Sequence, residues 1–441
     1  MACSSGIIRG KNNQFLNMSI LQILAEYVRT IRFAFATTWW FVFPIFLYYV
    51  FHWLYIRWLW REYKGKLKWA MMEIKPPRNI ERSPRVMEQV FTALHGSFST
   101  LNWFDYYLKG KLFQPMFVFE IRGINGEMHF YVRTEKRFRN MVESLVYAQY
   151  PEAEVEDVED YAMGVPANLP NADWDLWGSD FDLIRDNAYP IRTYTRFQEE
   201  VTKGMIEPLG SFADLITGLP PGVEAWCQLL VIPVKNSEWE PHIKKVVNKL
   251  TKREEKKEFG AIVSFFKEIV DILVSSVQYI FGPVPEKEED KKEEPPLQFR
   301  LTPVEKDVLQ AVEESFGKKA FNTKVRFLVL GPRKVFYEDL RKGPLGFFDQ
   351  FGDANLNTLK TNNDTKTYAN YFFVAMRKRW AKRKIFIRYI TRDNDGPKII
   401  LNSEELATIY HMPDMSAMSP AIARIEAKKG GAPLNLPVTA S

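Results

Sequence analysis

The sequence has few of the residues that bind metals or form disulfides. Its 441 residues include two cysteines, Cys3 and Cys227, and five scattered histidines. One cysteine lies in a polar tail and the other in an apolar run, which argues against a disulfide framework and favours a reducing compartment. No pair of Cys or His residues has the spacing of a metal site, so we expect neither a metal nor a cofactor.

Motifs of enzyme chemistry are missing too. The chain contains no GxxxxGK[ST] phosphate loop, no GxSxG turn, no HExxH and no paired CxxC. Glu156 and Asp157 belong to a run of six acids, which is typical of a solvated surface, and His411 is expected to be a packed side chain. We therefore predict no catalytic residues and a protein that is not an enzyme.

Neither sign of charge dominates the chain. The 60 Lys and Arg residues exceed the 54 Asp and Glu residues by only six, which is a weak argument for a polyanionic partner. Aromatic residues, in contrast, make up 15% of the chain, with 33 Phe, 19 Tyr and 12 Trp. This content favours membrane contact or large aromatic cores.

One long stretch has no formal charge at all. Residues 33–56 provide 24 such residues, and at 1.5 Å per residue they are long enough for a hydrocarbon layer of about 30 Å. We predict a transmembrane helix at 33–60, after a polar tail and an amphipathic approach segment at 1–32. The residues expected at the two membrane surfaces are Trp39, Trp40, Trp53, Tyr55, Arg57, Trp58, Trp60 and Arg61.

Two alternatives to a transmembrane helix are a signal peptide and a buried core hairpin. The apolar run starts late, is long for a signal peptide and lacks a small-residue cleavage site. Basic residues flank both ends of the run, but Lys64, Lys66 and Lys68 add to the C-terminal side. The positive-inside rule therefore favours a single-pass protein of the cell membrane with its C-terminal body in the cytoplasm.

Residues 68–160 have the pattern of a β-α-β-β-α-β unit, the ferredoxin-like order. Two alternating strands flank Asn125-Gly126, which suits a type I′ hairpin. Ser83, followed by Pro84, is expected to cap the first helix of the unit, and Thr134 the second. The predicted fold class is thus α+β, with an N-terminal transmembrane helix and two such modules.

The second predicted module covers residues 223–411. Residues 161–222 precede it as a connecting segment with short strands at 181–185 and 191–194, and a Pro/Gly-rich tail follows at 412–441. The module is expected to have a buried strand at 225–234 and a last strand at 385–389. Its helices are expected to begin with two capping boxes, formed by Ser237 with Glu240 and by Thr302 with Glu305.

An amphipathic helix at 259–281 interrupts this module and precedes a charged linker at 285–296. Its broad apolar face is expected to contact the membrane surface or a partner subunit, with docking on the chain's own core as the alternative. The residues of that face are Phe259, Ile262, Val263, Phe266, Ile269, Val270, Leu273, Val277 and Ile280.

Six cations occur within the eight residues 377–384. This basic segment is a candidate polyanion-binding site, formed by Arg377, Lys378, Arg379, Trp380, Lys382, Arg383 and Lys384. It could hold nucleic-acid phosphates with Trp380 stacking on a base, or anionic lipid headgroups or an acidic partner surface. The remaining alternative is a solvated helix end.

Several stretches carry a resemblance to a known family. They are residues 84–96 (PRVMEQVFTALHG), 227–233 (CQLLVIP), 325–327 (VRF), 357–360 (NTLK), 401–413 (LNSEELATIYHMP) and 432–437 (APLNLP). They resemble the region before the motor in membrane-anchored ATPases of type IV secretion and conjugation, especially from small-genome uncultured bacteria. This resemblance implies a location and an assembly, and it brings no catalytic residues.

In that family a motor domain follows the resembling region, whereas this chain ends where the motor would begin. The resemblance therefore implies a standalone paralogue or one half of a split gene. We expect a membrane-anchored scaffold that contacts lipids, forms a homo-oligomer and docks a separate motor ATPase. The alternative is a nucleic-acid-binding adaptor that uses residues 377–384.

Overall fold

The computed structural model describes residues 20–77, 82–109, 111, 114–197, 207–251, 301–370 and 372–413. The amphipathic segment 259–281, the charged linker and most of the C-terminal tail lie outside the described residues. The chain divides into two units. Residues 1–67 and 100–112 form the first unit, and the rest of the chain forms the second, which we call the body.

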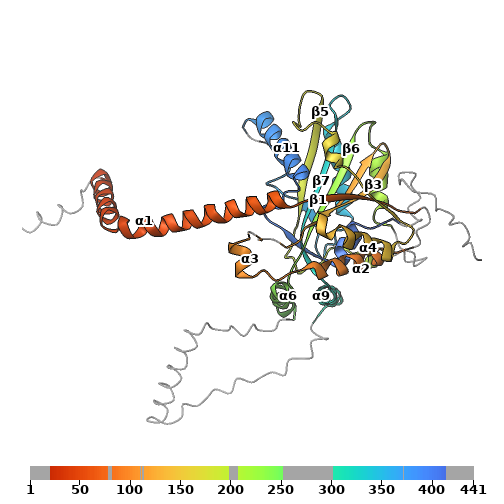
Figure 1. Cartoon of the computed structure of the whole chain (residues 1–441), viewed down its shortest axis with the longest axis horizontal. Helices are drawn as coiled ribbons and strands as arrows, with labels where there is room; N and C mark the ends of the chain where they lie inside the picture. Colours follow the sequence, from red (N-terminus) through yellow and green to blue (C-terminus); the bar gives the residue numbers. More distant parts are fainter. Residues whose placement is uncertain are drawn as a thin grey trace, which may run out of the picture. The chain divides into compact units, whose positions relative to one another are not determined.

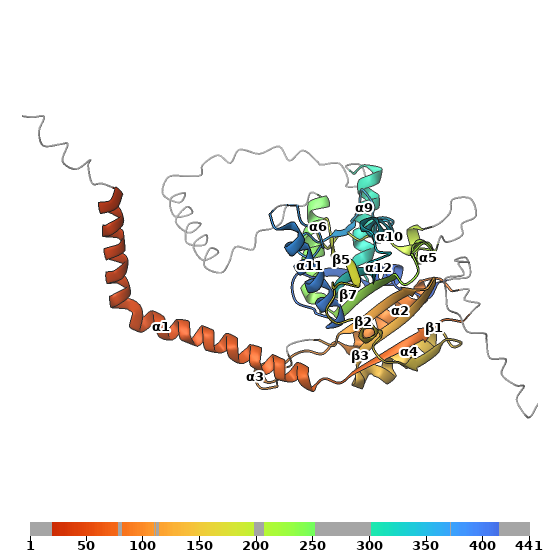
Figure 2. The same ribbon diagram turned by 90° about the horizontal axis from the view of Figure 1, so that it is seen from above.

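The first unit consists of helix α1 (Ile20–Lys66) and the short helix α3 (Trp103–Tyr107). α1 continues through Pro44, and its first part is turned away from the rest of the helix (Figures 1 and 2). The stretch from Phe35 to Lys66 is long and apolar enough to cross a membrane, and its most apolar window is not buried. Length and composition alone would also admit a signal sequence.

The described part of the body contains one nine-stranded antiparallel sheet with the order β4-β1-β3-β2-β6-β7-β5-β8, and β9 pairs with β7. The strands are β1 (Trp69–Lys75), β2 (Phe117–Ile124), β3 (Glu127–Glu135), β4 (Glu154–Asp157), β5 (Trp174–Leu183), β6 (Glu224–Pro233), β7 (Ala320–Pro332), β8 (Leu359–Thr361) and β9 (Ile399–Asn402).

Helices cover the two faces of the sheet unequally (Figures 1 and 2). One face carries α2 (Arg85–Leu94), α4 (Arg139–Gln149), α5 (Gly210–Thr217), α10 (Lys342–Asp349) and α12 (Ser403–Ile409), whose apolar side chains share one large core with the strands. The other face carries α11 (Val374–Ile390), which packs on a smaller, aromatic-rich core. A further pair, α6 (Asn236–Leu250) and α9 (Pro303–Phe316), forms its own apolar cluster.

The sheet has two halves with the same strand order. In the first half, the chain order β1-α2-β2-β3-α4-β4 gives the spatial order β4-β1-β3-β2; in the second, β5-α5-β6-β7-α10-β8 gives β8-β5-β7-β6. The halves meet where β2 pairs with β6, in a register that places Glu120 opposite Gln228. We call this junction the seam. The chain segment expected as a connection, 161–222, thus supplies a strand and a helix of the second half.

Two local predictions are confirmed. Asn125 and Gly126 join β2 to β3 with φ angles of 52° and 83°, as a two-residue hairpin requires. Thr302 and Glu305 form the expected capping box at the start of α9, with Thr302 N donating to Glu305 Oε2 at 2.8 Å. Where β2 and β3 need only two residues, β6 and β7 are separated by the segment that contains α6 and α9.

Two predicted helix caps in the first half are wrong. Thr134 lies inside β3, fully buried opposite Ala70 of β1, because the pairing of these strands extends past it. The helix that it was expected to cap begins only after a turn of 3-10 helix. Ser83 is not the N-cap of α2, because Pro84 occupies that position. The backbone carbonyl of Ser83 instead accepts a hydrogen bond from Val86 N.

The predicted capping box of Ser237 and Glu240 is also absent. Lys235 adopts the extended backbone of an N-cap, with φ −67° and ψ 130°, and α6 begins at Asn236. Ser237 therefore already lies within the first turn, where its hydroxyl cannot cap the helix.

The strand predicted at 385–389 is a helix. Ile385, Phe386 and Tyr389 are buried while Ile387 is 42% exposed, so the segment has the period of a helix and belongs to α11. The strand predicted at 191–194 is irregular, because side chains of α12 accept its backbone N–H groups: Ile191 N donates to a carboxylate oxygen of Glu405 at 2.9 Å.

Candidate functional site

The predicted basic segment lies on α11. This helix carries seven cations and no acid. Its C-terminal half is fixed to the sheet by buried Ile385, Phe386 and Tyr389, whereas most side chains from Phe372 to Trp380 are exposed. The half of α11 that contains most of the candidate residues therefore projects from the body.

Two of these cations are paired with acids from distant parts of the chain. Lys378 Nζ lies 2.9 Å from Glu338 and lowers the pKa of that carboxyl group through their hydrogen bond. Lys382 Nζ lies 2.7 Å from Asp175, which Arg333 also approaches at 3.7 Å. Both lysines face the body and help to hold the helix against it.

A pocket of about 450 Å³ lies between α11 and the segment that leads into β5. Four cations and one acid line it: Arg333, Lys378, Arg379, Lys382 and Asp175. The excess of positive charge suits a small anion, although Glu338 and Asp175 already pair with both lysines.

Three other cations of the segment have no acid partner among the described residues. Arg379 and Arg383 make no hydrogen bond or ion pair with any described residue. Lys384 Nζ lies 4.7 Å from the ring centroid of Trp380, a cation–π contact on a side chain that is 63% exposed. These three cations are available to an external anion.

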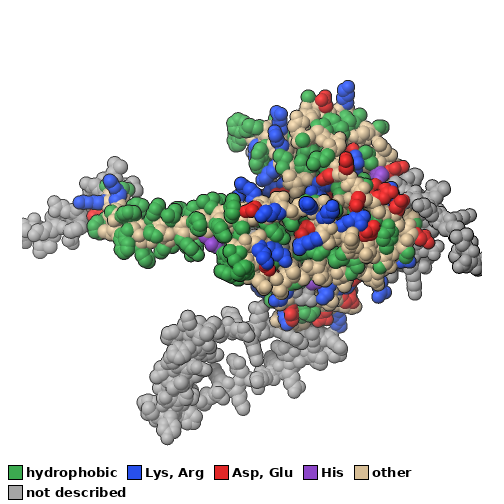
Figure 3. Space-filling view, in the orientation of Figure 1, with side chains coloured by type: hydrophobic (Ala, Val, Ile, Leu, Met, Phe, Trp, Pro, Cys, Tyr) green, Lys and Arg blue, Asp and Glu red, His purple; other side chains and the backbone are tan. Residues whose placement is uncertain are grey.

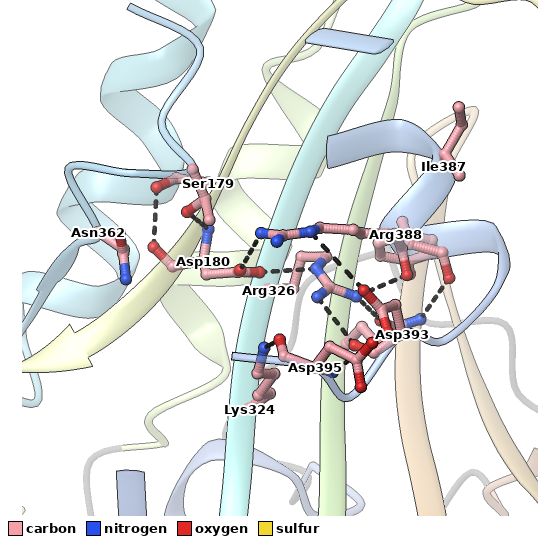
Figure 4. A network of polar contacts seen from close by, with 12 residues as sticks. Ser179, Asp180, Lys324, Arg326, Asn362, Ile387, Arg388, Asp393 and Asp395 are labelled. Atoms are coloured by element: carbon pink, nitrogen blue, oxygen red, sulfur yellow. Dashed lines mark hydrogen bonds and ion pairs between the residues drawn. The ribbon is translucent and has the colours of Figure 1, made fainter. Parts of the chain in front are cut away.

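A buried network of charged groups fastens the C-terminal end of α11 (Figure 4). Arg326 of β7 is fully buried and donates to Asp180 of β5 at 2.6 Å and to the Gln228 side chain of β6 at 2.9 Å. It also donates to the backbone carbonyl of Arg388 at 2.8 Å. The network thus joins three strands of the second half to the helix that lies over them.

The same network crosses the seam. Gln228 Nε2 donates to Glu120 of β2 at 2.7 Å, and Arg392 donates to both oxygens of Glu120 at 3.0 and 3.1 Å. Arg392 also binds Asp160. Burial alone would raise the pKa of Asp160, but the hydrogen bonds and charge of Arg392 outweigh it and lower that pKa. Each charge is paired, so the arrangement suits a structural lock.

A second pocket, of about 240 Å³, lies beside this network. Its lining has charges of both signs, among them Asp182, Lys324 and Arg388. Burial raises the pKa of Asp182 and lowers the pKa of Lys324, so burial disfavours the charged form of both groups. Among the described residues, no group of three or more His, Cys, Asp or Glu side chains is placed to hold a metal ion.

His411 is fully buried, as expected for a packed side chain. Its Nδ1 lies 2.9 Å from the carbonyl oxygen of Ala407, and its Nε2 contacts the carboxylate of Glu207. Cys227 is also buried, in β6, and burial raises the pKa of its thiol. Both side chains are enclosed by the core and out of reach of a ligand.

The predicted membrane-surface residues all lie on α1. Trp39, Trp40, Trp53 and Trp58 are exposed, and Tyr55, Trp60 and Arg61 lie on the same helix. Arg57 stacks on Trp53 at 5.1 Å from the ring centroid.

The sequence did not lead us to expect the short helix α3, which packs against the C-terminal part of α1. Helix α3 carries the residues WFDYY, and the hydroxyl of Tyr55 donates to the carbonyl of Tyr107 at 3.0 Å. His52 and Tyr107 also pack together, with ring centroids 5.8 Å apart. Trp103 and Phe104 remain 68% and 59% exposed. The run of aromatic residues at 103–107 was the signal that could have found it.

A family model matches most of the chain. No curated protein matches the chain significantly. A family model described as a domain of unknown function (DUF8128) matches residues 62–424, which include the whole described body. Since this match covers well over half of the 441 residues, the chain belongs to the DUF8128 family.

Proposed function

We propose that the protein is a non-enzymatic, membrane-anchored scaffold, and the observation that carries this proposal is the first unit. An apolar helix whose exposed surface is mostly hydrocarbon and aromatic rings needs an apolar environment. Near its C-terminal end, Arg57, Lys64 and the exposed rings of α3 form the mixture of cations and aromatics that is enriched where a membrane meets water.

The proposed orientation places the body in the cytoplasm. Arg57, Arg61, Lys64, Lys66 and Lys68 lie between the apolar stretch and β1, which is the side that the positive-inside rule assigns to the cytoplasm. A buried, unpaired cysteine in the body agrees with a reducing compartment.

We further infer that the body is built from two ferredoxin-like modules. The support is the repeated chain order and the 4-1-3-2 strand order in each half of the sheet. The inference also explains why the halves join through β2 and β6, since these are the corresponding edge strands of the two modules. Joining the two edges covers backbone groups that would otherwise be open to another chain.

The resemblance to the region before the motor of type IV secretion and conjugation ATPases indicates in which kind of apparatus the scaffold would act. We propose that it is an assembly subunit of such an apparatus, forms a homo-oligomer and docks a separate motor ATPase. The paired charges of the buried network and the absence of a phosphate loop from the sequence favour a structural part over a motor.

Two measurements on the full chain test this function. The detergent-solubilised protein should not hydrolyse ATP above the level of a buffer control, and turnover without a partner would refute the scaffold assignment. Chemical crosslinking in native membranes, followed by mass spectrometry, should recover copies of the chain together with a P-loop ATPase. Recovery of the chain alone, with neither self-crosslinks nor an ATPase, would contradict the assembly role.

A further inference from the structure

The exposed side of α11 carries an apolar stripe. Phe373, at the start of the helix, and Met376, Trp380 and Ile387 are 76%, 65%, 63% and 42% exposed. The spacings of four and seven residues place Met376, Trp380 and Ile387 on one side of the helix, and Phe373 is the N-cap residue that precedes it. That side is opposite the buried Ile385, Phe386 and Tyr389, so none of the four contributes to the attachment of the helix.

Cations flank this stripe on both sides. At 100° per residue, Arg379 and Arg383 lie along one edge, and Arg377 and Lys384 lie along the other. No acid occurs in the helix. In the space-filling view, hydrophobic and basic side chains gather where α11 projects from the body (Figure 3). The surface is therefore apolar along its centre and positively charged along its edges.

We propose that this face of α11 docks in the interface of a membrane that contains anionic lipids. An apolar stripe enters the boundary between headgroups and acyl chains, while flanking cations meet the lipid phosphates above it. The inference rests on the proposed function in one respect. The chain passes from α1 to β1 through Leu67 and Lys68 alone, so anchoring by α1 keeps the body close to a membrane surface.

Nucleic acid fits the same surface less well. A polyphosphate strand needs cations that converge along its backbone and flat rings for its bases. Here the cations are divided by a stripe that contains Met376 and Ile387, which cannot stack with bases as rings do, and both would stay exposed to water. A lipid interface satisfies the apolar centre and the charged edges together.

The test places a fluorescent probe on the stripe of the full chain. Met376→Cys in a Cys3→Ser background is labelled with an environment-sensitive NBD dye, since Cys227 is buried and does not compete. The protein is reconstituted into nanodiscs with or without phosphatidylglycerol, and spin-labelled lipids serve as quenchers. We expect a blue-shifted, quenchable emission only with the anionic lipid.

The matched control carries the dye at Leu345→Cys. Leu345 is also a partly exposed apolar residue of a helix, but α10 lies on the opposite face of the sheet. Its emission should be independent of lipid charge. Neutralising Arg379 and Arg383 to glutamine in the Met376→Cys protein should lower the ratio of docked to undocked helix about fivefold per cation, or about 25-fold in total.

Equal quenching in neutral and anionic nanodiscs, or a response to a DNA oligonucleotide in place of lipid, would overturn the proposal. Carbonate extraction of the same labelled chain separates this inference from the anchor. A carbonate-resistant chain with no response to lipid charge refutes the docking of α11 and leaves anchoring by α1 intact. An extractable chain whose probe still responds to anionic vesicles refutes the anchor and supports the docking.

Discussion

Replacing Arg392 with methionine should destabilise the body strongly, because it breaks the buried network at the seam. Methionine retains a similar apolar stem but loses every hydrogen bond of the guanidinium group. Among the described residues, Glu120 then keeps only the bond from Gln228 Nε2 at 2.7 Å. Asp160 is less affected, since its side chain is 21% exposed and still accepts from Ala162 N.

The expected cost follows from the burial of Glu120. Its side chain is fully buried, so water cannot replace the two bonds that Arg392 supplied. Breaking a buried ion pair by removing one partner costs about 3–5 kcal/mol, because an uncompensated charge remains inside. A second change, Glu120→Gln, removes that charge and should return a large part of the lost stability.

Urea unfolding of the detergent-solubilised full chain, followed by intrinsic fluorescence, measures this difference. Lys244→Met is the matched control. Lys244 pairs with Glu240 on an exposed helix surface, and such pairs contribute less than about 1 kcal/mol. If Arg392→Met costs no more than Lys244→Met, or if the double variant is less stable than Arg392→Met, the assignment of the network as a lock is wrong.

Three further changes test other parts of the body. Burial raises the pKa of Glu405 to about 7 from 4.5, so between these pH values the folded state holds a proton that the unfolded chain releases. The free energy of unfolding should therefore fall by about 3 kcal/mol as pH rises from 4.5 through 7. Glu405→Gln should flatten this slope in urea unfolding curves taken across that range. Gly126→Ala should cost about 1–2 kcal/mol in urea unfolding, because its φ of 83° is unfavourable for a residue with a side chain; an unchanged midpoint would contradict the turn. Thr302→Ala should lose about 1 kcal/mol by the same measurement, through the missing cap of α9, and no loss would mean that the capping box is not formed in solution.

Elements whose causes are local could be predicted from the sequence. Asn125-Gly126 specifies its hairpin by backbone conformation alone, and Thr302 with Glu305 forms its box within four residues. Thr134 has equally good local chemistry for a cap, but its strand continues because β1 supplies partners for two more residues. Tertiary pairing overrides a local preference of about 1 kcal/mol.

The seam and the lock could not be predicted in this way. Paired residues of β2 and β6 are more than one hundred positions apart in the sequence, and neither apolar run has a pattern that indicates pairing with the other. The cations of α11 were visible as a cluster, but the pairing of Lys378 and Lys382 depends on Glu338 of a 3-10 helix and Asp175 of β5, which are distant in the sequence. The alternation of Ile385, Ile387 and Tyr389 fits a strand or a helix equally well over so few residues.

Fractionation of native membranes tests the central claim most directly. The full chain, tagged after Ser441, should remain in the membrane pellet after an alkaline carbonate wash, with its N-terminal helix intact. Protease added outside intact cells should leave the tag untouched, and permeabilisation should expose it. A chain recovered in the soluble fraction, or one shortened by removal of α1, would contradict the claim that α1 anchors a cytoplasmic scaffold.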